Sequence, residues 1–245
     1  RILLIAAVLA FGFTGMNACS GQTDLVAFLE SKPSPTLLQL KYAIVKGADV
    51  NLEVNGTTPL TMAVVKDMNP FIVNELVRSG ARVDKMLADG SVSLLALAVI
   101  NSQNTETIKI LLEAGAKPDE SAIFAAVKGD NLEKLKMLVQ YGGKLEPQHN
   151  SGRNLLKAAA ASCSNPEIPA YLVRSGFKID STDMPGTLPI HVAARLNRNP
   201  QLVEFLVRAG ANIEVRDQKG MTPLLHAVVR NENPEVVRSL IGLGA

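Results

Sequence analysis

A short pattern that ends in glycine recurs along the chain at a nearly constant period. Its glycines are Gly47, Gly80, Gly115, Gly142, Gly176, Gly210 and Gly244, separated by 33, 35, 27, 34, 34 and 34 residues. A period near 34 is typical of arrays in which each repeat is one supersecondary unit. Such a unit cannot bury its apolar face alone, so the repetition predicts a solenoid stabilised by stacking.

Each repeat carries start signals for two helices. An Ala-rich first helix opens twenty residues before each glycine from the second onward, at Leu60, Leu95, Ala122, Leu156, Ile190 and Leu224. Thr58 and Thr222 are suited to cap two of these helices, each followed by a proline in the first turn, where a missing N–H costs nothing.

The second helix of a repeat starts four times with the same Asn-Pro pair. The pairs lie at residues 69–70, 165–166, 199–200 and 233–234. Asparagine is a good N-cap and proline is favoured at the first helical position, so the pair predicts a helix start. The glycine that follows tolerates the left-handed conformation that closes a helix. Aliphatic residues such as Val203, Leu206 and Val207 are expected to face the neighbouring repeat.

The segments Gly56-Thr57-Thr58-Pro59-Leu60 and Gly220-Met221-Thr222-Pro223-Leu224 resemble the start of an ankyrin repeat. The resemblance covers residues 24–245 and implies an all-α ankyrin-repeat solenoid of about seven stacked helix-turn-helix units with hairpin loops. The first helix pair, within residues 24–31 and 36–46, is divergent and is expected to cap the array. The hairpin between Gly115 and Ala122 is nearly deleted, and the usual polar cap is not expected at the C-terminal end.

The N-terminal segment is separate from the repeats. The run from Ile2 to Phe13 has no charge and is too short to span a bilayer, so residues 1–18 are interpreted as a signal peptide. The following Met16-Asn17-Ala18-Cys19 resembles the lipobox of bacterial lipoproteins, which implies that Cys19 is lipidated and that residues 19–23 form a tether. Ser20, where a retained lipoprotein would carry Asp, favours the outer membrane. The alternative is a soluble periplasmic or secreted protein that is cut nearby.

The second cysteine, Cys163, lies in an Ala-rich segment and is interpreted as a small buried filler. Should Cys19 stay free, the two could pair in an oxidising compartment, although nothing in the sequence supports that pairing. Two cysteines and three histidines without close spacing give no convincing zinc site. We therefore expect no metal.

The histidines do not form a recognisable catalytic arrangement. His191 occupies the histidine position of the ankyrin motif, where the resemblance implies a hydrogen bond from the imidazole to loop backbone. His149 falls in a hairpin and His226 on a first helix. No strand feeds a glycine-rich phosphate loop, so neither an enzyme nor a cofactor is expected.

The resemblance implies that a partner binds the concave face formed by first helices and hairpin tips. The candidate contact residues are Met62, Lys66, Leu97, Phe124, Lys128, Val192, Arg195, His226 and Arg230. These residues are apolar or basic without an acid, which favours an acidic protein surface as partner. The alternative is that cations simply favour the C-terminal ends of short helices.

The net charge of +2 creates no strong positive field that would attract nucleic acid, so nucleic acid is not expected as a partner. We expect a protein partner and a monomeric chain. The function hypothesis is a non-catalytic protein–protein interaction module, lipid-anchored in the bacterial envelope and facing the periplasm. It would act as an assembly scaffold or as an immunity-type inhibitor. The alternative is a structural or protective envelope component without a tight partner, for example in resistance to oxidative stress.

Overall fold

The computed structural model describes residues 24–86, 90, 92–103, 105–146, 154–180 and 186–245. It divides into two compact units, one ending at Ala122 and one spanning Ile123–Ala245. Within the described residues the regular structure consists of 14 helices, and two isolated β-bridges join Val54 to Thr57 and Met86 to Ser93. The predicted all-α class is confirmed.

The helices alternate along the chain as first and second members of pairs. Those of the first unit are α2 (Leu25–Glu30), α3 (Leu37–Val45), α4 (Pro59–Val65), α5 (Pro70–Arg78), α6 (Leu94–Asn101) and α7 (Glu106–Glu113). Helix α8 (Glu120–Lys128) crosses the division. Those of the second unit are α9 (Leu132–Gln140), α10 (Leu155–Ser162), α11 (Glu167–Arg174), α12 (Pro189–Leu196), α13 (Pro200–Arg208), α14 (Pro223–Arg230) and α15 (Pro234–Gly242).

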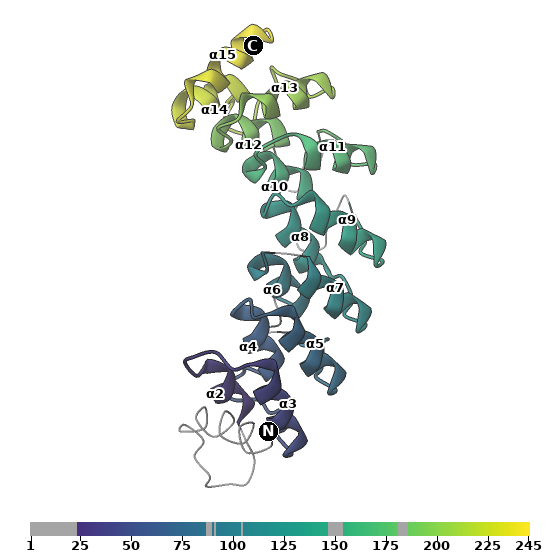
Figure 1. The fold of residues 1–245 in the computed structure, drawn as a ribbon. Helices are drawn as coiled ribbons and strands as arrows, with labels where there is room; N and C mark the ends of the chain where they lie inside the picture. The colour runs from purple at the N-terminus through teal and green to yellow at the C-terminus, as the bar shows by residue number, and fades with distance from the viewer. Residues whose placement is uncertain (1–23, 87–89, 91, 104, 147–153, 181–185) are drawn as a thin grey trace. The chain divides into compact units, whose positions relative to one another are not determined.

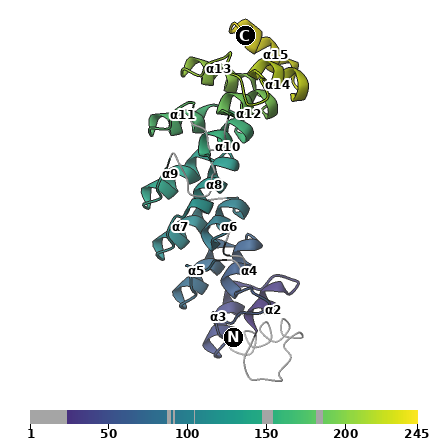
Figure 2. The ribbon, with the colours of Figure 1, turned by 180° about the vertical axis from the view of Figure 1, so that it is seen from behind.

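Within each unit, first helices pack on first helices and second helices on second helices. In the first unit, α4 contacts α2 and α6, while α5 contacts α3 and α7 (Figure 1). In the second unit, α12 lies between α10 and α14, and α13 packs on α15 (Figure 2). This stacking buries the apolar face that a single pair would leave in water.

The predicted helices are confirmed, and their starts differ from the prediction by at most two residues: the first helices begin one residue earlier than predicted, and α8 begins two residues earlier, at Glu120. Thr58 and Thr222 cap α4 and α14 through their hydroxyls, and Asn69 caps α5 through its carboxamide. Helix α11 begins at Glu167, one residue later than the sequence predicts. The carboxamide of Asn165 nevertheless accepts a hydrogen bond from the Glu167 N–H at 2.8 Å. In the other three Asn-Pro pairs, too, the asparagine carboxamide accepts from the N–H of the residue two positions later.

The seven glycines that end the repeats all adopt the left-handed conformation, with φ between 92° and 102°. At Gly210, the N–H donates to the Val207 carbonyl and the next N–H, that of Ala211, donates to the Leu206 carbonyl. This pair of bonds satisfies carbonyls that the helix end would otherwise leave open. A residue with a Cβ is strained at this φ, which explains the glycine period.

The core of the second unit is a ladder of aliphatic side chains. Val203 and Leu206 of α13 are fully buried in one cluster with Val236 and Leu240 of α15, in the next repeat, and Val207 packs on the edge of the same cluster. The expected inward positions are therefore confirmed. Cys163 is also buried, although it follows α10 as its C-cap instead of lying within a helix.

Helices α2 and α3 form the first pair, and only a short loop separates α7 from α8. Helices α2 and α3 bury Leu25, Leu29 and Leu40 completely. Between α7 and α8, the Asp119 carboxylate accepts hydrogen bonds from the Ser93 hydroxyl at 2.8 Å and from the Ala122 N–H at 3.1 Å. A short loop can therefore hold the start of α8 against the preceding repeat.

Candidate functional site

Asparagine side chains in the second unit join the turn between the two helices of one repeat to the same turn of the preceding repeat. We call Asn197, Asn199, Asn231 and Asn233 the asparagine ladder. Asn197 Nδ2 donates to the carbonyls of Ala160, at 3.1 Å, and Cys163, at 2.8 Å. Asn231 Nδ2 repeats this pattern 34 residues later, on the carbonyls of Ala194 and Asn197.

The remaining members of the ladder bond to the carbonyl of the residue that follows the acceptors Cys163 and Asn197. Asn199 Nδ2 donates to the Ser164 carbonyl and Asn233 Nδ2 to the Arg198 carbonyl. The ladder thus satisfies C-terminal carbonyls that a short helix and its turn leave without partners. It also fixes the positions of the turns, which form the walls of the groove described next.

Cys163 occupies the position in its repeat that is equivalent to Asn197 and Asn231 in the next two repeats. Its Sγ lies 3.6 Å from the Val127 carbonyl oxygen. Burial, together with the nearby Asp130 carboxylate, raises the pKa of the thiol far above its ordinary value. A neutral thiol is a poor nucleophile, so this cysteine fills space and does not react.

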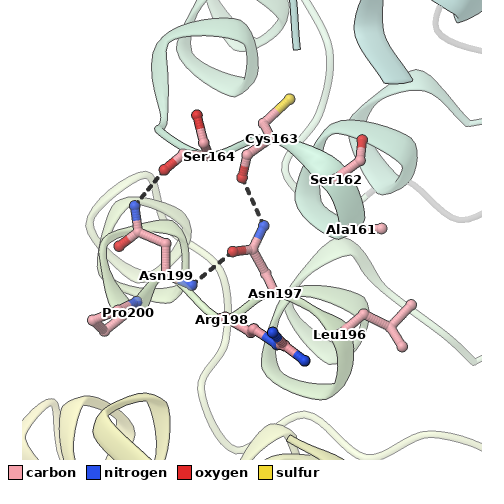
Figure 3. Close-up of a pocket in the computed structure, with 9 residues that line it drawn as sticks. All are labelled: Ala161, Ser162, Cys163, Ser164, Leu196, Asn197, Arg198, Asn199 and Pro200. Carbon is pink, nitrogen blue, oxygen red and sulfur yellow. Dashed lines mark hydrogen bonds between the residues drawn. The ribbon is translucent and has the colours of Figure 1, made fainter. Parts of the chain in front are cut away.

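An open groove of about 550 Å³ lies between the turn after α10 and the turn after α12 (Figure 3). We call it the α10–α12 groove; its lining residues are Ala161, Ser162, Cys163, Ser164, Leu196, Asn197, Arg198, Asn199 and Pro200. Asn197 and Asn199 join its two sides through their hydrogen bonds to the carbonyls of Cys163 and Ser164. Leu196 is 53% exposed, and the exposed Arg198 pairs with Glu232.

A second cluster lies where the hairpin before α14 meets the first helices. Nε2 of His226 lies 2.8 Å from Oδ2 of Asp217, and the His226 ring packs edge-on against His191 at 5.4 Å between centroids. Burial opposes ionisation of Asp217, but hydrogen bonds from the backbone of Met221, from His226 and from the backbone of Lys219 outweigh it and lower its pKa to about 2. These contacts hold the hairpin onto α12 and α14.

The tautomer of His191 follows from its two hydrogen bonds. The Leu188 N–H donates to Nδ1 at 3.1 Å, so Nδ1 carries no proton and Nε2 donates to the Val215 carbonyl at 3.2 Å. This confirms the expected bond to loop backbone. Burial is the main cause that lowers the pKa of His191, with the neighbouring His226 adding to it.

In the first unit, the three predicted contact residues differ in their surroundings. Met62 on α4 and Leu97 on α6 are half-buried. Lys66, directly after α4, is exposed, and its Nζ lies 3.4 Å from the Leu29 carbonyl of the preceding pair. Of the three, Lys66 offers the most surface to a partner.

In the second unit, Lys128 and Arg230 are exposed and Phe124 is half-buried. Val192 is only 7% exposed because α10 and α14 flank its helix on both sides. His226, with a side chain 12% exposed, is held by Asp217 and has little surface left for a partner. His149 and Cys19 lie outside the described residues.

Arg195, the remaining predicted residue, lies on the last turn of α12. It is half-buried, and its Nε is buried without a hydrogen-bond partner among the described residues. An unsatisfied buried donor of this kind costs free energy. The neighbouring α10–α12 groove was not predicted from the sequence, because the groove depends on how two turns 34 residues apart come together. Its only signal in the sequence is Leu196, an apolar residue at a position where other repeats carry polar or charged residues.

Among the described residues, no three His, Cys, Asp or Glu side chains are grouped to hold a metal ion. In the same part of the chain, none of the helices combines the length and the apolar character needed to cross a bilayer.

Comparison with known proteins connects this architecture to a family. A family model described as ankyrin repeats (3 copies) matches residues 95–183 and 170–245. The chain is 38% identical over 79 residues to a zebrafish (Danio rerio) protein named putative palmitoyltransferase ZDHHC13. That match covers 32% of the chain and 12% of the relative, so the chain spans only a small part of the relative's length.

Solved structures match over most of the chain. The human ASB11 ankyrin repeat domain superposes with a TM-score of 0.72 at 25% identity, covering 85% of this chain and 93% of that one. The ankyrin repeat domain of Bcl-3, described as a unique member of the IkappaB protein family, has a TM-score of 0.62 at 22% identity, covering 91% and 99%.

Proposed function

Because the chain belongs to the ankyrin repeat family, we propose that it is a non-catalytic module that binds another protein through its first helices. One observation carries the proposal: the side chain at the end of the first helix is exposed in repeat after repeat. It is Lys66 in the first unit, where the half-buried Asn101 is the exception, and Lys128, Ser162, Leu196 and Arg230 in the second. These side chains vary in chemistry while the glycine that ends each repeat does not, as expected of a surface that selects a partner on a rigid scaffold.

The proposed localisation of the module is based on its N-terminal motif. We propose that Cys19 carries a diacylglyceryl group and that the repeats face the periplasm, as an assembly scaffold or an immunity-type inhibitor. Support comes from the apolar run before Met16-Asn17-Ala18-Cys19 and from the small residue preceding the cysteine. Two or three acyl chains would make the anchoring stable.

Site-specific cross-linking tests the binding function. Benzoylphenylalanine is introduced at Leu196, on the first-helix side, and separately at Tyr141, an exposed residue that ends α9 on the second-helix side. Irradiation of bacterial cells that express the chain natively should give one discrete cross-linked protein from position 196 and none from position 141. Equal capture at both positions, or no product at position 196, would instead support a protective envelope component without a tight partner.

Intact mass tests the anchor independently. The protein isolated from bacterial membranes should begin at Cys19 and carry acyl mass that Cys19→Ser removes. An unmodified N-terminus at another residue would show a soluble periplasmic or secreted protein, and the binding function would remain open to the cross-linking test.

A further inference from the structure

We infer that the α10–α12 groove and the adjoining Arg195 bind an acidic segment of a partner protein, in which an apolar side chain lies between carboxylates. This inference rests on the proposed binding function and names the chemistry of the partner. The apolar side chain would contact Leu196, and a carboxylate would bind the guanidinium of Arg195.

The state of Arg195 is the first argument. A guanidinium has five N–H donors in a planar fork, which matches the two oxygens of a carboxylate. The Nε of Arg195 is buried without an acceptor among the described residues, but the side chain as a whole is only half-buried, so a carboxylate would bind its two terminal Nη groups. Lysine could not replace it, because an ammonium lacks the fork.

The charges of the neighbouring helices are the second argument. Helices α10, α12 and α14 pack side by side and carry Lys157, Arg195 and Arg230 without any acidic residue. Acids close to these helices already have partners: Glu232 pairs with Arg198, Asp130 accepts from the Ser164 N–H and hydroxyl, and Asp217 is hydrogen-bonded to His226. This face is therefore complementary to carboxylates.

The shape and polarity of the groove are the third argument. Its volume of about 550 Å³ is sufficient for a few side chains. Leu196 presents an exposed apolar surface there, next to the small Ala161 and the polar Ser162. An apolar side chain would dock against Leu196 while flanking carboxylates reach the cations around it.

The overall charge favours a protein over a polyphosphate chain. The full chain carries a net charge of only +2, so there is no extended basic field to neutralise a nucleic-acid backbone. Arg195, a single prepared guanidinium beside an apolar contact, fits a carboxylate side chain within a peptide.

Titration by NMR with defined peptides tests the inference. The full chain labelled with ¹⁵N is titrated with acetyl-Glu-Leu-Glu-amide, and the same titration is run with acetyl-Lys-Leu-Lys-amide at concentrations up to about 10 mM. The acidic peptide should shift the backbone amides of residues 161–164 and 195–199, and the basic peptide should not. The inference is overturned by an absence of shifts in these two segments, or by equal shifts with both peptides.

Two variants and one control assign the effect to this site. Arg195→Gln should weaken binding about tenfold, because a charge-assisted bond is lost. Leu196→Asp, at an exposed position that does not endanger folding, should abolish it by repulsion. Arg208→Gln on α13, in the same repeat but on the second helix, should bind as the unaltered chain does. Unchanged binding by Arg195→Gln, with a native spectrum, would overturn the inference.

The cross-linking experiment separates this inference from the proposed function. Capture of one protein at position 196 that persists in Arg195→Gln would overturn the acidic-segment inference and leave the binding module intact. Capture that is lost in Arg195→Gln but retained in Arg208→Gln would support both.

Discussion

Asn197 Nδ2 lies 2.8 Å from the carbonyl oxygen of Cys163 and donates a hydrogen bond to it, joining two consecutive repeats at their turns. The same nitrogen also donates to Ala160, whose carbonyl belongs to the C-terminal end of α10 and has no partner within the helix. Asn197 itself is buried, so water cannot replace these bonds.

Asn197→Ala is expected to lower the free energy of unfolding of the chain by about 2 to 4 kcal/mol, since three side-chain hydrogen bonds are lost and buried carbonyls are left without donors. Urea unfolding followed by circular dichroism measures this change. Asn74→Ala is the control, because Asn74 is half-buried on α5 and makes no side-chain hydrogen bond among the described residues. Equal effects of the two substitutions would contradict the structural role of the ladder.

His191 should make stability fall on mild acidification. Its pKa is lowered in the folded chain, chiefly by burial, so below the unfolded value of about 6.5 the unfolded chain binds more protons. The stability is fully present above that pH and is lost as the pH falls toward the folded pKa, by at most about 1.4 kcal/mol per pH unit. Asp217 does not change the stability between pH 7.5 and pH 5, because its unfolded pKa of about 3.9 and its folded pKa of about 2 both lie below this range.

Urea midpoints at pH 7.5 and pH 5.0 check this prediction. The difference between the two pH values should be smaller in His191→Asn than in the unaltered chain, whatever the substitution does to stability at pH 7.5. An identical pH dependence in both proteins would show that another group titrates.

Two glycine-to-alanine substitutions should have opposite signs. Gly210 has φ of 102°, so Gly210→Ala should destabilise the chain by about 1 to 2 kcal/mol through backbone strain alone, since no atom lies near the added Cβ. Gly242 lies in α15 with an ordinary helical φ and open space around it, so Gly242→Ala should stabilise by about 0.5 to 1 kcal/mol. Thermal unfolding measures both, and destabilisation by Gly242→Ala would refute the argument.

Cys163 should resist alkylation in the folded chain. Its Sγ is buried and its pKa is raised, so iodoacetamide at pH 8 should modify it at least about a hundredfold more slowly than in urea. Peptide mass mapping identifies the modified cysteine, so Cys19 does not contribute to the signal. A cysteine introduced at the adjacent exposed position by Ser162→Cys should react rapidly, and slow modification there would indicate poor access of the reagent.

The sequence predicts the features that depend on neighbours within a few residues. Thr58 as a cap, the Asn-Pro starts and the left-handed glycines all follow from local backbone chemistry. The α10–α12 groove and the His226–Asp217 pair do not, because each needs groups from different elements at a particular distance. Val192 illustrates the same limit: it has the right helical position for a contact residue, but both flanking helices cover it.

The asparagine ladder also makes part of the chain interchangeable. Asn197 and Asn231 donate to carbonyls at the same offsets, 34 and 37 residues earlier. Removal of residues 197–230, a segment of 34 residues, would bring Asn231 to the acceptors that Asn197 now uses. As far as the asparagine ladder is concerned, duplication or deletion of one repeat in this part of the chain therefore keeps the hydrogen bonds between neighbouring turns.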